Sequence, residues 1–168
     1  EWSYTNPLVA DMDLRLRYES YSDGLHVTLS WRGVSGQPDL PCFGLSFLLD
    51  PSLHVVRYFG KGPEENYVDR CRGTLQGWFT MDTRTALTPY IHPQESGNRM
   101  GVDTLLLTDD EGHGLEITGE DLEITALPYL PEQLTAARHP DELPDISRTV
   151  LDVALFRKGV GGDDSWGA

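Results

Sequence analysis

The chain has 168 residues, of which 39% are hydrophobic and 24% are charged, a size and composition typical of a globular domain with its own core. Thirteen Lys and Arg residues stand against 27 Asp and Glu residues, which gives a net charge of −14. Such a charge repels phosphate backbones and anionic lipid headgroups, so we expect neither a nucleic-acid partner nor a membrane partner.

The first predicted element is a β-hairpin. Residues 11–19 and 25–31 both alternate apolar and polar side chains, and Asp23-Gly24 lies between them. An Asp-Gly pair tolerates the positive φ that a tight hairpin turn needs. The pattern therefore predicts two antiparallel strands joined by a short turn.

Further strands are predicted along the rest of the chain. The segments with period-two or β-rich character are 43–49, 53–59, 102–107, 115–117, 122–126 and 146–157. One short helix is predicted over residues 131–139, because Pro131 suits a first helical position and Pro140 stops the helix. We expect an all-β fold of antiparallel hairpins, a β-sandwich with at most one short helix.

Gly60-Lys61-Gly62 follows a predicted strand and invites comparison with a phosphate-binding loop. Pro63 has no N–H to offer an anion, and Glu64 and Glu65 would repel one. The segment is therefore predicted to be a rigid turn that leaves the strand.

The other acids and histidines give no strong catalytic signal. Neighbouring acids such as Glu64 and Glu65 point to opposite sides of an extended segment, so we expect most of them to be solvated. The histidines lack metal-ligand spacing. His92 is the exception with a possible functional role, since it lies in a polar loop, although a structural role is favoured.

The end of the chain combines flexible backbone with an aromatic ring: Gly161-Gly162-Asp163-Asp164-Ser165-Trp166. Asp and Ser side chains can bond their own backbone and hold a turn. A Trp presented from a loop can stack on the C–H face of a sugar ring. Composition alone favours packing of Trp166 under its loop over such stacking.

Four segments together resemble one family: residues 58–70, 90–99, 127–139 and 159–166. Their content and order are similar to the C-terminal small-chain domain of bacterial glycoside hydrolase family 2 β-galactosidases. The resemblance implies an antiparallel supersandwich of the galactose-mutarotase-like type. The family domain is longer than this chain, so residues 1–168 are expected to be a single truncated domain of a larger β-galactosidase.

The resemblance also implies where the chemistry lies. The catalytic acids of the family, with its magnesium and sodium ligands, lie on a separate domain, so no catalytic residue, metal ligand or cofactor is expected in this chain. Trp166, supported by Gly161, Gly162, Asp163, Asp164 and Ser165, is expected to contact the sugar on the acceptor or leaving-group side. The implied partners are the remaining domains and a β-galactoside, in a homo-oligomeric enzyme of the bacterial cytoplasm.

Two alternatives stay open from the residues. One is a sugar epimerase of mutarotase type, with His92 and Glu95 as acid and base, and the other is a stand-alone carbohydrate-binding module. The role of Arg99 is left unassigned.

Overall fold

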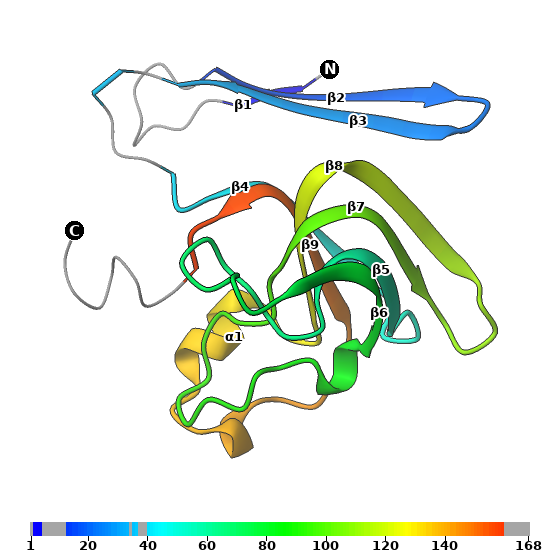
Figure 1. Ribbon diagram of the computed structural model, residues 1–168. Helices are drawn as coiled ribbons and strands as arrows, with labels where there is room; N and C mark the ends of the chain where they lie inside the picture. Colours follow the sequence, from blue (N-terminus) through cyan, green and yellow to red (C-terminus); the bar gives the residue numbers. More distant parts are fainter. Residues whose placement is uncertain (1, 5–12, 34, 37–39, 160–168) are drawn as a thin grey trace. The chain divides into compact units, whose positions relative to one another are not determined.

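The structure is a computed structural model that describes residues 2–4, 13–33, 35–36 and 40–159. The chain divides into two compact units, Glu1–Leu40 and Pro41–Ala168. Figure 1 shows the strands of both units.

The first unit contains a three-stranded antiparallel sheet with the order β1-β2-β3. Its strands are β1 (Trp2–Tyr4), β2 (Asp13–Tyr21) and β3 (Gly24–Arg32). Tyr21 pairs with Gly24 across the turn, and Gly24 has a positive φ of 148°. The predicted hairpin and its turn are therefore confirmed.

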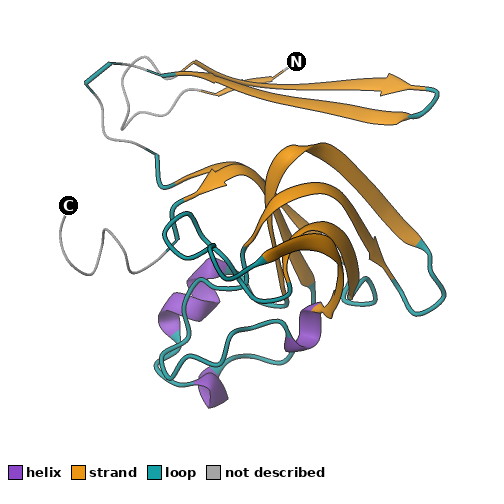
Figure 2. Cartoon of the chain, viewed as in Figure 1, coloured by secondary structure: helices purple, strands orange, loops and turns teal. Residues whose placement is uncertain are grey.

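The second unit is built on one six-stranded antiparallel sheet with the order β4-β9-β8-β7-β5-β6. Its strands are β4 (Cys42–Leu49), β5 (Val55–Gly62), β6 (Leu75–Asp82), β7 (Arg99–Thr108), β8 (Gly114–Leu127) and β9 (Thr149–Arg157). The helix α1 (Pro131–Ala136) and two 3₁₀ turns, η1 (Thr83–Thr85) and η2 (Pro140–Glu142), complete it. Figure 2 shows these helical turns and the long loops below the curved sheet. The predicted all-β class is confirmed, and the antiparallel sheets are consistent with the predicted sandwich.

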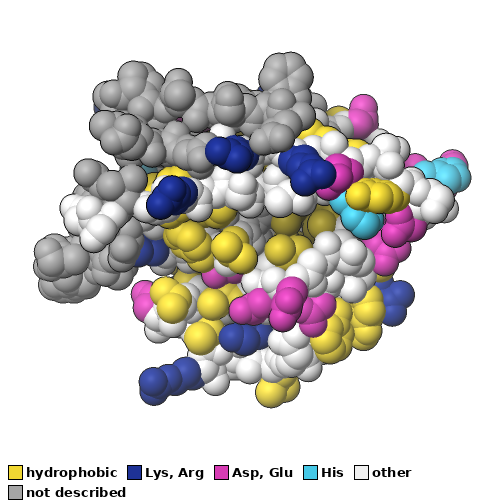
Figure 3. Space-filling view, turned by 90° about the horizontal axis from the view of Figure 1, so that it is seen from above, with side chains coloured by type: hydrophobic (Ala, Val, Ile, Leu, Met, Phe, Trp, Pro, Cys, Tyr) yellow, Lys and Arg dark blue, Asp and Glu magenta, His cyan; other side chains and the backbone are white. Residues whose placement is uncertain are grey.

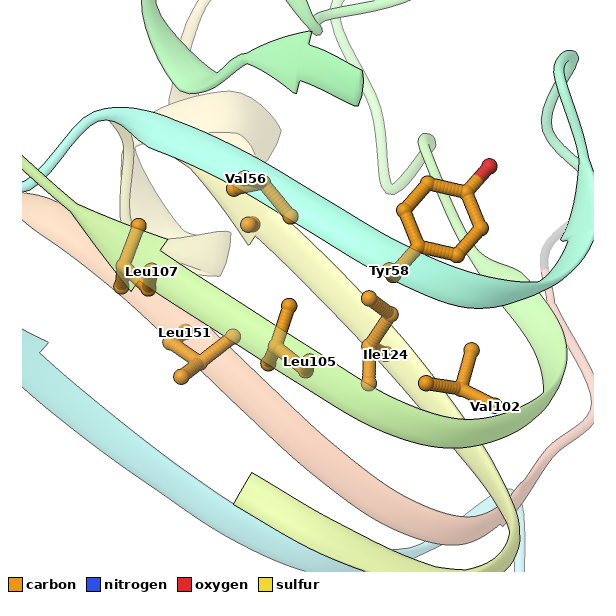
Figure 4. Packing of buried hydrophobic residues seen from close by; sticks show 8 residues of the cluster. Val56, Tyr58, Val102, Leu105, Leu107, Ile124 and Leu151 are labelled. Carbon is orange, nitrogen blue, oxygen red and sulfur yellow. The ribbon is translucent and has the colours of Figure 1, made fainter. Parts of the chain in front are cut away.

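The core of the second unit lies on one face of this sheet. Figure 4 shows side chains from β5, β7, β8 and β9 along that face. The cluster consists of Val56, Tyr58, Val102, Leu105, Leu107, Ile124, Ala126 and Leu151. Alternate residues of paired strands meet there, because Tyr58 is opposite Leu105 and Ala126 is opposite Leu151.

The Gly60-Lys61-Gly62 segment differs from its prediction, because β5 runs through both glycines and the loop begins at Pro63. A Cβ at Gly60 would lie 2.7 Å from Val102 Cγ2, and one at Gly62 would lie 2.7 Å from Phe79 Cδ2. Such distances are shorter than side chains tolerate. The two glycines therefore permit close packing within the sheet and do not form a turn.

Two further elements differ from the sequence pattern. Strand β6 was not predicted, although Phe79 and Met81 alternate along it and pack on the core. Helix α1 ends at Ala136, earlier than expected, because Ala137 is extended and Pro140 begins η2.

The alternation predicted for residues 146–157 is also only partly right. Leu155 is exposed, whereas Asp152 is buried. Strand β9 is an inner strand between β4 and β8, and residues on both of its faces are buried along most of its length. A β-bulge between Phe43 and Gly44 shifts the register opposite Leu155.

The charges of the described residues form no continuous basic surface on the face that Figure 3 displays. Lys and Arg side chains are scattered there among acidic, apolar and uncharged ones. Within the described ranges, no helix has the length and apolar character that crossing a membrane requires.

We predict that Leu105→Ala lowers the free energy of unfolding of the second unit by about 3 kcal/mol, because Leu105 is fully buried and its truncation leaves a cavity. Leu75→Ala is the matched control, since Leu75 is 74% exposed, and should change stability by less than about 0.5 kcal/mol. Urea unfolding followed by circular dichroism measures both. Equal losses in the two variants would contradict this assignment of the core.

Candidate functional site

A cavity of about 350 Å³ lies between the sheet of the second unit and the segments around α1. We call it the sheet–helix cavity. Strands β8 and β9 supply one wall, and the segment 92–95 and α1 supply others. The residues that line it are His92, Pro93, Gln94, Glu95, Thr125, Leu127, Tyr129, Pro131, Leu134, Thr135, Val150, Asp152 and Arg157.

One end of the cavity is charged. The guanidinium of Arg157, whose side chain is 9% exposed, donates to Asp152 Oδ2 at 2.8 Å through Nη2. Its Nη1 lies 3.2 Å from Glu95 Oε1. Burial disfavours the charged guanidinium, but the two carboxylates outweigh this effect and raise the pKa of Arg157. A buried cation thus joins two acids from separate segments.

The remaining walls are mainly apolar. Leu127, Leu134 and Val150 are buried, and Tyr129 is half-buried beside them. An apolar cavity with a few convergent polar groups is the common form of a small-molecule site in proteins.

The wall formed by residues 92–95 is held in place by the carboxylate of Glu65, whose side chain is 9% exposed. Its Oε2 accepts hydrogen bonds from Thr88 Oγ1 at 2.7 Å and from the Gly97 N–H at 2.6 Å. Its Oε1 accepts hydrogen bonds from Tyr90 and from Arg70, each at 2.5 Å. The segment before β7 is therefore tied at three points to the loop after β5.

Burial alone would raise the pKa of Glu65, but the hydrogen bonds from Tyr90, Gly97 and Thr88, with the charge of Arg70, outweigh it and hold the pKa below its ordinary value. Most of the neighbouring acids were expected to be solvated, and Glu65 is an exception, because its side chain is only 9% exposed. The sequence signal was weak, because the donors lie 5 to 32 positions away.

Two buried asparagines extend this connection. Asn66 donates its backbone N–H to Asn98 O at 2.8 Å. Asn98 Nδ2 donates to Asn66 O at 2.9 Å and to Glu123 Oε2 at 2.7 Å. Burial raises the pKa of Glu123, against the opposing effects of the Asn98 hydrogen bond and of Arg157. The motif around Asn66 thus supports the segment that forms one wall of the cavity.

Two of the residues whose roles the sequence left open lie together in the structure. His92 and Glu95 both line the sheet–helix cavity, and His92 Nδ1 lies 2.9 Å from Pro93 O. Arg99 is buried instead, where its Nε donates to the Tyr58 hydroxyl at 3.0 Å and its Nη1 donates to the carbonyls of Gly97 and Asn98. These contacts give Arg99 a structural role.

The principal predicted site lies outside the described residues: Gly161, Gly162, Asp163, Asp164, Ser165 and Trp166. The last described residue is Gly159, which has a φ of 81°. A Cβ at this position would lie 2.5 Å from Tyr67 Cδ1. Gly159 is therefore required where the backbone passes close against the buried Tyr67 ring.

Among the residues that the structure describes, no group of three or more His, Cys, Asp or Glu side chains could hold a metal ion. Cys42 and Cys71 are free thiols. The carboxylates of the cavity have Arg157 as their cationic partner.

We predict effects of different size for the same substitution at two acids, Glu65 and Glu123. Glu65→Gln should lower the free energy of unfolding at pH 7 by about 3 kcal/mol, because an amide cannot accept at both oxygen positions and leaves Arg70 without its anion. Glu123→Gln should lower it by no more than about 1 kcal/mol, because the amide oxygen can still accept from Asn98.

The pH dependence distinguishes the two acids further. The pKa of Glu65 lies below its ordinary 4.5, so its contribution is complete above pH 4.5 and is lost as the pH falls through the folded-state value. The pKa of Glu123 lies above 4.5, so the wild type loses stability relative to Glu123→Gln as the pH rises through that value. Urea unfolding between pH 3 and pH 8 tests both, and parallel curves for the two variants would refute the assignment.

Comparison with known proteins assigns the chain to a family. Residues 2–168 match the model described as beta galactosidase small chain. The chain is 40% identical to a beta-galactosidase of Halalkalibacterium halodurans over 94% of its length, and 40% identical to one of Lactobacillus delbrueckii subsp. bulgaricus over 98%. It spans only 16% of the length of each of these relatives. It is 29% identical to the beta-galactosidase small subunit of Latilactobacillus sakei, over 99% of this chain and 56% of that subunit. From the matched region and these identities, the chain belongs to the β-galactosidase small chain family.

Proposed function

We propose that this chain is a non-catalytic domain of a β-galactosidase, in which Trp166 contacts the sugar on the acceptor or leaving-group side. The observation that carries the proposal is the extent of the match: almost all of this chain corresponds to 16% of relatives named beta-galactosidase. In Latilactobacillus sakei the corresponding region belongs to a protein named as a small subunit. Its partners would then be the remaining domains of the enzyme and a β-galactoside.

The hydrogen bonds that two acids, Glu65 and Asp152, already accept support a non-catalytic role. Glycoside hydrolysis needs one carboxyl group that can give up a proton and a second that can act as nucleophile or base. Glu65 accepts four hydrogen bonds, and Asp152 accepts from Ser46 and Arg157. The carboxylate oxygens of Glu65 and Asp152 that accept these bonds are not free to contact a substrate. In this proposal bond cleavage, with the magnesium and sodium ions of the family, belongs to segments outside this chain.

The contact between Gly159 and Tyr67 supports the sugar contact proposed for Trp166, which follows in the chain. Tyr67 is buried, and its backbone pairs with that of Arg70. Gly159 passes close against the ring only seven positions before Trp166. The start of the Trp166 segment is thus anchored to the part of the chain that Glu65 and Asn66 hold rigid. Such an anchor would allow a loop-borne Trp to meet a sugar in a fixed orientation.

A second candidate function, sugar epimerisation, is favoured by one observation. His92 and Glu95 line the same cavity, as an acid and base acting on one sugar would have to do. The ion pair between Glu95 and Arg157 weighs against it, because it engages a carboxylate oxygen that a catalytic base would need for the substrate.

We predict that the isolated 168-residue chain hydrolyses no β-galactoside, because the catalytic carboxylates lie on other segments in this proposal. A nitrophenyl-galactoside assay measures hydrolysis, and polarimetry of freshly dissolved galactose tests epimerisation in the same preparation. Turnover that survives repurification and is lost in Glu95→Gln would contradict the non-catalytic role.

We predict that Trp166→Ala in the full-length enzyme raises KM and changes the ratio of hydrolysis to sugar transfer, while kcat stays within about tenfold of the wild type. The stacking face would hold the acceptor ring and leave charge development at the bond unchanged. Trp166→Phe should restore part of the effect, because it keeps a flat apolar ring. If Trp166→Ala leaves KM, kcat and the product ratio unchanged, Trp166 is a packing residue.

A further inference from the structure

Strand β6 forms one edge of the six-stranded sheet, and its sequence does little to protect that edge. Among the described residues its backbone pairs only with β5, from Leu75 to Asp82 without a shift of register. The strand has no Pro, no Lys and no Arg, and its only charge is at Asp82, its last residue. Natural edge strands usually carry charges, prolines or bulges, because unpaired N–H and C=O groups otherwise accept a further strand. The edge of β6 is therefore open to strand addition.

The opposite edge of the sheet, β4, is better protected. A bulge interrupts the pairing of β4 with β9 between Phe43 and Gly44, and Pro41 directly precedes the strand. Bulges and prolines are two of the features that disfavour the addition of another strand. The two edges are therefore not equivalent, and β6 is the edge suited to accept a strand.

Exposed aromatic surface accompanies β6. Trp78 is 49% exposed, its ring centroid lies 5.6 Å from that of Phe59, and Arg57 Cζ lies 4.7 Å from the centroid of the Trp78 ring. Leu75, at the start of the strand, is 74% exposed. Trp and Arg are among the residue types that most often dominate the binding energy of protein–protein interfaces. We call the β6 backbone with Arg57, Phe59, Leu75 and Trp78 the β6 edge surface.

The charge of this surface favours an acidic partner. Arg57 and Lys61 lie on the same face of β5 as Phe59, because alternate residues of a strand share a face. Within the described part of the chain neither cation forms an ion pair, and Arg57 contacts the Trp78 ring instead. An Asp or Glu on an incoming segment would complement the Arg57 charge. A second copy of this chain would instead bring its own Arg57 towards the same surface, which like-charge repulsion disfavours.

The relatives indicate where such a segment could come from. This chain corresponds to 16% of the length of the beta-galactosidases of Halalkalibacterium halodurans and Lactobacillus delbrueckii subsp. bulgaricus. It corresponds to 56% of the small subunit of Latilactobacillus sakei. Each of these proteins therefore contains a large amount of polypeptide outside the matched region, and that polypeptide is available to cover the β6 edge surface.

We propose that an extended segment of the enzyme from outside residues 1–168 adds to β6 as a further strand, with an apolar side chain on Trp78 and a carboxylate beside Arg57. In this mode of recognition main-chain hydrogen bonds provide affinity, and alternate side chains provide specificity. The proposal rests on the proposed function only in taking the chain as a domain of a larger β-galactosidase. It is independent of the contact proposed for Trp166.

Hydrogen exchange followed by mass spectrometry tests the added strand, by comparing the full-length enzyme with the 168-residue chain. The amides of residues 75–82 should exchange at least about tenfold more slowly in the full-length enzyme, because amides that face the open edge gain hydrogen-bond partners. Exchange in the inner strand β7 is the internal reference. It corrects for any difference in the overall stability of the two proteins.

Two substitutions in the full-length enzyme test the side chains. Trp78→Lys adds the kind of charge that protects natural edge strands and should remove at least about fivefold of the protection of residues 75–82. Leu48→Lys is the matched control, since Leu48 is 59% exposed on the opposite edge strand, and it should leave that protection unchanged. Arg57→Glu should also weaken the protection, whereas Arg57→Lys should retain it. Unchanged exchange in β7 shows that the sheet of each variant is intact.

Three results would overturn the proposal. These are equal exchange of residues 75–82 in the enzyme and the 168-residue chain, equal losses in Trp78→Lys and Leu48→Lys, or protection that rises with the concentration of the 168-residue chain alone. The last result would make a second copy the occupant. An unprotected β6 in an enzyme whose KM responds to Trp166→Ala would reject this surface and leave the proposed function standing. A protected β6 with kinetic constants that Trp166→Ala leaves unchanged would do the reverse.

Discussion

The hydrogen-bonded junction between the loop after β5 and the segment before β7 is the interaction on which the rest of the second unit depends. Glu65 and Asn66 on one side meet Gly97 and Asn98 on the other through backbone and side-chain hydrogen bonds. Asn66, Gly97 and Asn98 are buried and the Glu65 side chain is 9% exposed, so an unpaired polar group in this junction would be costly. The junction therefore fixes two loops that the sheet itself does not hold.

This junction sets the position of the loop segment that covers one face of the sheet. By fixing residues 88–98, it positions Glu95 opposite Arg157 and closes the cavity over β8 and β9. Through Tyr67 it also fixes the course of the chain at Gly159. One buried carboxylate and two asparagines thus support both the sheet–helix cavity and the start of the segment that leads to Trp166.

The two faces of the sheet carry different kinds of side chain. One face carries the apolar cluster around Leu105, whereas the other carries Thr125 and Asp152 of β8 and β9. A buried cation with two carboxylates adds little to stability, because the cost of removing charges from water offsets their attraction.

Local patterns in the sequence were sufficient for most of the fold. Alternation at residues 11–19 and 25–31 and the Asp23-Gly24 turn predict the first hairpin, since period-two alternation and turn chemistry act between neighbours. The motifs around Asn66, Arg99 and Trp166 likewise identify the family.

Tertiary structure decided the rest. Gly60 and Gly62 serve packing, because Val102 and Phe79 approach them from other strands. The Glu65 carboxylate is shielded from solvent, because its donors Tyr90 and Gly97 come from a distant loop. The sheet–helix cavity depends on Glu95, Thr125 and Arg157, which are far apart along the chain and meet only through sheet order and loop position. Sequence periodicity records which side of a strand is apolar, but it holds no information on which distant segment covers that side.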